Sequence, residues 1–153
     1  LGSNASISAA VLSVKVFSKL DDLVAAPDWD IYTSTPASNT VLVSSDFGQL
    51  GTTSQTGSAQ TYASATDGAY SDFTFNGTGR GNVSKTGISK FGIRNANYDV
   101  ADVAPPFVAS AYSRIYINHA EVAGTGSDPK LVITYTLSAA TTWASAKMMV
   151  GIG

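Results

Sequence analysis

The sequence predicts an all-β fold, an antiparallel β-sandwich, and three observations carry this prediction. Apolar and polar residues alternate with a period of two in several short segments, which is the pattern of half-buried strands. Ten Asp stand against one Glu, and Asp favours turns whereas Glu favours helices. Clusters of Gly, Ser, Thr, Asn and Pro separate the alternating segments. At 153 residues the chain fits one domain.

Residues 1–61 hold three predicted strands. Residues 9–18 alternate well, because Leu12, Val14 and Val16 fall on one face. An Asp-rich loop follows, and the next two strands are expected at 29–35 and at the short apolar run 40–45. The stretch 48–61 is Gly, Ser, Thr and Gln almost throughout and is expected to be a surface loop.

The chain after residue 61 holds four more predicted strands, divided by a Gly-rich turn and by a long loop that ends at two prolines. We expect the strands at 70–76, 88–94, 111–118 and 131–137, the turn at 77–87 and the loop at 95–107. Nothing shows the 3.6-residue period of a long amphipathic helix. If a ligand or metal binds, it should lie beside loop 19–28, 48–61 or 95–107, since sites concentrate on loops.

The inner faces of these strands define the predicted core, since two packed sheets bury alternate residues. We expect burial of Leu12, Val14, Val16, Phe73, Phe75, Ile115, Ile117, Leu131 and Ile133.

Composition argues against several function classes. The net charge is −2 and the nine Lys and Arg are scattered, so there is no basic stripe for nucleic acid. The chain has no Cys, which removes disulfides, thiolate nucleophiles and Cys-based zinc sites. No apolar run of about 18 residues is present, so we expect no membrane span.

A catalytic role is not expected. His119 is the single His, with Glu121 two residues on, and a general base needs a partner that the sequence does not single out. The G-x-S-x-G nucleophile motif is absent. We therefore expect no enzyme activity and no cofactor.

Two sets of residues are candidate binding sites. The first could supply oxygen ligands to calcium, which takes six to eight of them, although the EF-hand spacing is absent. The alternative is that these aspartates cap turns. The set is Asp21, Asp22, Asp28 and Asp30.

The second set is a candidate glycan-binding platform on the strand 111–118. Tyr112 and Tyr116 flank Arg114 on one face, and aromatic rings stack on the apolar faces of sugars.

Four segments resemble jelly-roll β-sandwich modules related to the DNRLRE-type and carbohydrate-binding-module-like domains. They are ISAAVLSVKVFSK, TSTPASNTVLVSSDFGQLGTTS, VSKTGISKFGIRNANYDVADVAPP and AYSRIYINHAEVAGTGSDPKLVITYT. The resemblance covers about residues 5–137, and its best marker is the closing DPKLVITYT. It implies a jelly-roll-like sandwich on secreted polysaccharide-active proteins or on phage-like surface, tail and virion proteins. It carries over no catalytic residue.

Such modules have one or more strands before the segment that matches LGSNASISAAV, and here these strands are missing. Three interpretations stay open: the chain begins inside a domain, the strands come from elsewhere, or Leu1–Ser3 is a cloning remnant. A missing strand would leave a sheet edge unpaired.

The segment after the last strand is expected to be an interaction segment. We divide the chain into a sandwich domain, 1–137, and a C-terminal tail, 138–153, which is apolar and nearly uncharged. Its candidate assembly residues are Trp143, Met148, Met149, Val150 and Ile152.

From these features we expect a non-catalytic structural or surface subunit of an extracellular or virion assembly: a decoration, tail or filament protein. Its partners would be other chains of the same assembly, most simply copies of itself. The alternative is a carbohydrate-binding module that tethers a larger protein or particle to a glycan.

Overall fold

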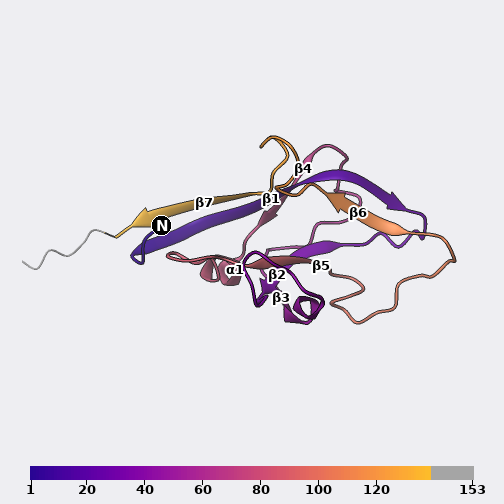
Figure 1. Cartoon of the computed structure of the whole chain (residues 1–153), viewed down its shortest axis with the longest axis horizontal. Coiled ribbons are helices and arrows are strands. Elements are labelled where there is room, and N and C mark those ends of the chain that lie inside the picture. The colour runs from indigo at the N-terminus through magenta and orange to yellow at the C-terminus, as the bar shows by residue number, and fades with distance from the viewer. Residues whose placement is uncertain (139–153) are drawn as a thin grey trace, which may run out of the picture.

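The computed structural model describes residues 1–138, which form two antiparallel sheets packed face to face (Figure 1). The all-β antiparallel sandwich expected from the sequence is therefore confirmed. One sheet contains β4, β1, β6 and β7, and the other has the order β3-β2-β5. The strands are β1 (Ala5–Asp21), β2 (Trp29–Ser34), β3 (Leu50–Ser54), β4 (Tyr70–Thr74), β5 (Phe91–Asn95), β6 (Ser113–Ile117) and β7 (Lys130–Leu137). Two short helices are η1 (Ser44–Gln49) and α1 (Gly77–Gly81).

Strand β1 is the centre of the larger sheet, because β4, β6 and β7 all pair with it. The Phe75 amide donates to the Ala10 carbonyl (2.9 Å), so even-numbered residues in this stretch of β1 bond toward β4. The Asn118 amide donates to the Lys15 carbonyl (2.9 Å), so odd-numbered residues bond toward the opposite edge. Strands β6 and β7 both lie along that opposite edge.

Strands β6 and β7 follow one another along this edge, and both run antiparallel to β1. The chain leaves the edge at Asn118 and rejoins it at Lys130, so 118–129 is an insertion at one point of the sheet. The Lys15 ammonium donates to Ser127 Oγ (3.2 Å), and Tyr70 Oη donates to the Asp128 carbonyl (3.0 Å). These contacts hold the base of the insertion against β1 and β4.

The core between the sheets is aromatic at its centre. The Trp29 and Phe73 rings meet edge to face with centroids 5.0 Å apart, and those of Phe75 and Phe91 do so at 4.9 Å. The buried core residues are Ala10, Val14, Val16, Trp29, Ile31, Ala65, Phe73, Phe75 and Val83. The predicted burial of Val14, Val16, Phe73 and Phe75 is thus confirmed, while Leu12, Ile115 and Ile133 are partly buried against the same cluster.

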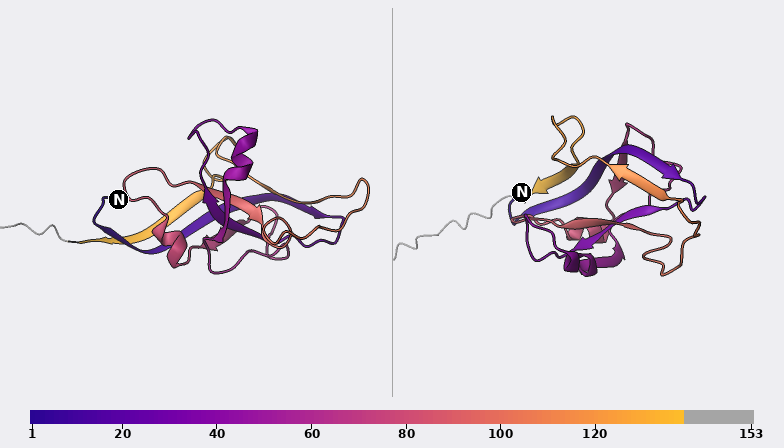
Figure 2. Two further views of the ribbon diagram at one scale, coloured as in Figure 1. Left: turned by 90° about the horizontal axis from the view of Figure 1, so that it is seen from below. Right: turned by 45° about the vertical axis from the view of Figure 1, so that its right-hand side comes forward.

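The predicted burial of Ile117 and Leu131 is wrong, since their side chains are 36% and 37% exposed. Strand β1 has 17 residues, whereas β2, β3 and β5 have six, five and five. The smaller sheet is therefore too short to cover the whole inner face of the larger one. Figures 1 and 2 show β7 and the N-terminal half of β1 projecting beyond it as a two-stranded ribbon.

The strand predicted at 40–45 is wrong, because residues 40–43 have no regular structure and η1 begins at Ser44. The Asp46 carboxylate accepts hydrogen bonds from the amides of Val43 (2.9 Å) and Ala37 (3.3 Å). A side chain that bonds nearby amides in this way offers the backbone an alternative to a sheet ladder.

The surface loop predicted at 48–61 is also wrong in part. It contains β3, which pairs with β2, and it places Gln55 and Thr56 in the interior. The irregular course predicted for 95–107 is confirmed, with turns and no regular helix.

The one-turn helix α1 lies close against the segment that follows β3. Asn76 is its N-cap and accepts from the Gly79 amide (2.9 Å), as side chains at this position commonly do. The side-chain amide of Asn76 donates from Nδ2 to the Thr56 carbonyl (2.7 Å), and the side-chain amide of Asn82 donates from Nδ2 to Gln55 Oε1 (2.7 Å). These bonds, here called the α1 clamp, satisfy Oε1 of the buried Gln55, whose Nε2 donates to the Thr53 carbonyl (2.8 Å).

The predicted tail lies outside the described residues from position 139 onward, together with Trp143, Met148, Met149, Val150 and Ile152. No helix in residues 1–138 is long and apolar enough to cross a membrane.

Candidate functional site

The predicted aromatic platform is on the outer face of β6. Tyr112 and Tyr116 are 55% and 46% exposed, and the Arg114 guanidinium lies 5.4 and 4.8 Å from their ring centroids. Phe17, the extra residue of a β-bulge in β1, is exposed beside Ser18, which pairs with Tyr116. The three predicted residues are thus together. Because the cation stacks on both tyrosines, a sugar ring would have to displace it or use the free ring faces.

The structure does not gather the four predicted calcium ligands. The Asp21 carboxylate accepts from the amides of Ala25 and Ala26 (both 2.8 Å) and from the Ser113 hydroxyl. Burial opposes ionisation of Asp21, but these hydrogen bonds outweigh it and lower its pKa. The result is a capped turn that joins the end of β1 to the start of β6.

Asp30 is buried in a different place, on β2. Its carboxylate accepts from the hydroxyls of Ser54 (2.6 Å) and Thr56 (2.5 Å) and from the Ile31 amide (2.7 Å). Asp22 is exposed and Asp28 is half-buried. Within residues 1–138, no three His, Cys, Asp or Glu side chains are grouped so that they could hold a metal ion.

His119 lies exposed in the 118–129 insertion, where its Nδ1 accepts from the Glu121 amide (3.2 Å). The two residues singled out by the sequence are therefore close, but they form a local turn in solvent.

A cavity of about 660 Å³ lies between the loop after β1 and the loop after β5. Apolar side chains of Leu23, Pro27 and Val103 line it together with the polar groups of Tyr98 and Asp102. Both loops are among the three beside which the sequence predicts a ligand to lie if one binds. Strained backbone concentrates here: the non-glycine residues with positive φ in the described chain are Val24, Ala26, Asp102 and Ser110.

Hydrogen bonds between the two loops hold this strained conformation. Tyr98 Oη donates to the Ala25 carbonyl (2.7 Å), and Asn97 bonds both the Ala26 carbonyl (3.2 Å) and the Asp28 amide (3.0 Å). The cavity walls are thus fixed by contacts within the protein.

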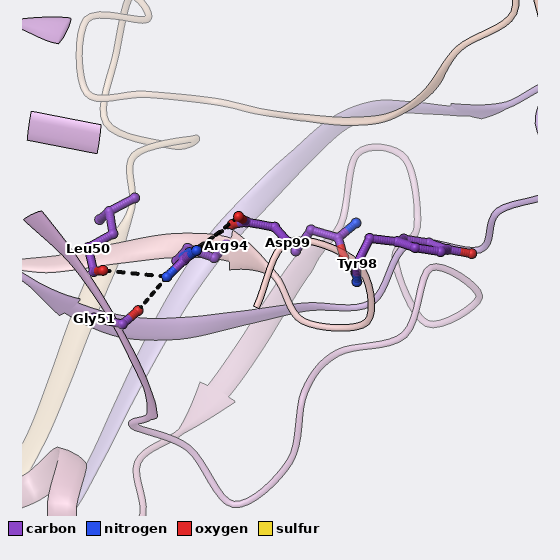
Figure 3. A network of polar contacts seen from close by, with 6 residues as sticks. Leu50, Gly51, Arg94, Tyr98 and Asp99 are labelled. Atoms are coloured by element: carbon purple, nitrogen blue, oxygen red, sulfur yellow. Dashed lines mark hydrogen bonds and ion pairs between the residues drawn. The ribbon is translucent and has the colours of Figure 1, made fainter. Parts of the chain in front are cut away.

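An ion pair that the sequence does not predict anchors the second loop to the smaller sheet (Figure 3). Arg94 donates from Nε and Nη2 to both carboxylate oxygens of Asp99 (2.7 and 2.9 Å), and from Nη1 to the Gly51 carbonyl (2.9 Å). The hydrogen bond from Arg94 lowers the pKa of Asp99. The segment between Arg94 and Asp99 can be recognised in the sequence as a turn. Whether the two side chains contact one another depends on the conformation of the whole loop.

An apolar groove of about 710 Å³, here called the η1 groove, lies beside η1 and is not predicted by the sequence. Its floor includes Leu50, Phe91 and Ile93, and its rim carries large apolar side chains that are mostly in water. The rim residues are Val41, Leu42, Val43, Phe47 and Ile88. The apolar character of the run 41–43 is visible in the sequence, but its exposure depends on the absence of the predicted strand at 40–45.

Comparison of the chain with known proteins gave no match to a protein-family model, a curated protein or a solved structure.

Proposed function

We propose that this protein is a non-catalytic structural or surface subunit of an extracellular or virion assembly, such as a decoration, tail or filament protein. The observation that carries the proposal is the exposed apolar rim of the η1 groove. Leu42 is 79% exposed and Phe47 is 69% exposed, and three further apolar residues stand beside them. Contiguous apolar surface of this kind commonly marks a contact with another protein.

The sequence supports the same proposal independently. Residues 138–153 carry Trp143 and the uncharged run MMVGIG, and an apolar segment of this kind favours contact with another chain. The partner chains are proposed to be other subunits of the assembly, copies of this chain included. The absence of a nucleophile motif in the sequence supports the non-catalytic part.

Light scattering of the whole chain tests the proposal, with the expectation that the wild type forms assemblies larger than one chain. Phe47→Asp should lower the mean mass, because a carboxylate on the rim would have to be desolvated in the contact. Phe107→Asp is the matched control, since Phe107 is 88% exposed and lies outside the η1 groove. Deleting 143–153 should also lower the mass and leave the β-type circular dichroism unchanged.

A strictly monomeric wild type would contradict the proposal. An equal loss of mass in Phe47→Asp and Phe107→Asp would show that the η1 groove is not the contact surface.

The alternative is a carbohydrate-binding module, and the exposed Tyr112–Arg114–Tyr116 platform favours it. Titration with a panel of polysaccharides is then expected to show binding at millimolar concentrations or below. Tyr112→Ala and Tyr116→Ala should each weaken that binding while circular dichroism stays the same. Binding that survives both substitutions would count against this alternative, and so would a failure to bind any polysaccharide of the panel.

A further inference from the structure

Strand β7 has one edge that no strand within residues 1–138 covers. Among these residues it pairs with β1 alone, and it forms the outer edge of the projecting ribbon (Figure 1). Proteins normally protect such an edge with charge, proline or a bulge, because its free amides and carbonyls can pair with another chain. Here the sequence 131–137, LVITYTL, contains no charged residue and no proline, and the register shift in the β1–β7 ladder falls on the β1 side, between Ile7 and Ala9.

The register shows which backbone groups of β7 are free. Val11 pairs with Val132, and odd-numbered residues in this part of β1 bond toward β7, so the amide and carbonyl of Val132 face β1. Backbone groups alternate in direction along a strand. The groups that face away from β1 therefore belong to Leu131, Ile133, Tyr135 and Leu137.

These four residues are arranged symmetrically about Thr134. If a second β7 is placed antiparallel with Thr134 opposite Thr134, every outward-facing residue meets an outward-facing residue of the other copy. Leu131 then pairs with Leu137, and Ile133 pairs with Tyr135. Thr134 and its counterpart form a pair without backbone hydrogen bonds, as the alternation of an antiparallel ladder requires.

The side chains fit this register as well. Ile opposite Tyr is a β-branched residue beside an aromatic one, and Thr opposite Thr is another favourable cross-strand pair. The pairing would place the inner faces of the two ribbons side by side in one sheet. Leu131 and Leu137, which are 37% and 58% exposed in the single chain, would then lie next to each other across the new edge. No charged side chain lies in the paired segment to oppose it.

We propose that two copies of this chain associate through β7, antiparallel about a two-fold axis at Thr134, and so form one continuous sheet across both. This inference rests on the proposed function as an assembly subunit, and it identifies β7 as the surface through which two subunits meet. The same surface patch is used by both copies, which is the geometry of a closed dimer. The η1 groove then remains available for contacts between dimers.

Cysteine cross-linking tests the pairing, because the natural chain has no Cys. In Thr134→Cys the two introduced residues would have Cα atoms about 4.5 Å apart across the pair without hydrogen bonds, within the range of a disulfide. Oxidation of the whole chain should therefore give a covalent dimer of twice the chain mass on non-reducing gels.

Thr136→Cys is the matched control on the same strand and the same face. In the proposed register Thr136 faces Val132 of the other copy, so two Thr136 positions lie roughly 13 Å apart, too far for a disulfide. A mixture of Val132→Cys and Thr136→Cys chains should instead give a mixed disulfide, which confirms the register with a second pair.

Each other outcome overturns the inference. A Thr136→Cys dimer without a Thr134→Cys dimer would show a different register. If neither variant cross-links while light scattering still shows assembly, the proposed function stands and the contact is elsewhere, for example with residues 139–153 covering β7. If the wild type is monomeric, both proposals fail. Phe47→Asp should leave the Thr134→Cys disulfide dimer intact, which distinguishes the β7 contact from a contact at the η1 groove.

Discussion

Replacing Phe73 by alanine is expected to lower the free energy of unfolding by about 3–5 kcal/mol, the range for removal of a fully buried ring. Phe73 has no exposed surface, and its ring meets the edge of Trp29 at the centre of the core. Truncation would leave a cavity between the two sheets that neighbouring side chains on rigid strands cannot fill. Urea unfolding followed by Trp fluorescence measures the change.

Ile133→Ala is the comparison for this experiment. Ile133 packs against the same core but is only partly buried, since it lies where the smaller sheet ends. Its loss should therefore be clearly smaller than that of Phe73. Equal losses at the two positions would mean that the inner face of β7 is covered in solution. The comparison is best made at a protein concentration where the chain is monomeric.

Gly79→Ala is expected to cost about 2–3 kcal/mol, as overpacking of a close contact does. A Cβ built at Gly79 would lie 2.0 Å from the carbonyl oxygen of Gln55, which is backbone and cannot rotate away. The helix would have to move away from Gln55, and the hydrogen bonds of the α1 clamp from Asn76 and Asn82 would lengthen. The same urea titration measures this change.

Gly81→Ala is the matched control in the same helix. A Cβ at Gly81 meets no atom within 4 Å, so only the intrinsic preference of alanine for helix acts there. That preference would raise stability by at most about 1 kcal/mol. If Gly79→Ala and Gly81→Ala behave alike, the close approach of α1 to Gln55 is not maintained in solution.

The parts of the fold that the sequence predicted are those whose signal is local. Strands β1, β2 and β4 alternate clearly, and their core positions Val14 and Phe73 follow from that alternation. Strand β3 has no such pattern: it is Gly- and Thr-rich and forms because β2 supplies a ladder. At Val41–Val43 the apolar run indicated a strand, but the carboxylate of Asp46 turns the chain into η1 instead.

The candidate sites also divide into those with a local signal in the sequence and those that depend on the packing of distant segments. The grouping of Tyr112, Arg114 and Tyr116 required only that 111–118 be a strand, so the sequence predicted it. The bidentate pair of Arg94 and Asp99 depends on a loop conformation, and the η1 groove depends on which apolar residues find no partner in the core. Neither property is encoded in a short stretch of sequence, because both follow from the packing of distant segments.

The central position of β1 also bears on how the chain is made. Its first residue, Ala5, pairs with Leu137, and none of its ladder partners precedes β4 in the sequence. At a synthesis rate of about 5–20 residues per second, β1 would wait roughly 6–25 s on the ribosome before β7 emerges. Until β4 emerges the apolar and uncharged stretch 5–14 has no strand to pair with, and residues 5–9 continue to lack one until β7 emerges, so chaperone binding to nascent chains should concentrate there. The sheet can close only after translation has passed its last strand, and the order of synthesis therefore delays folding to a late, nearly concerted step.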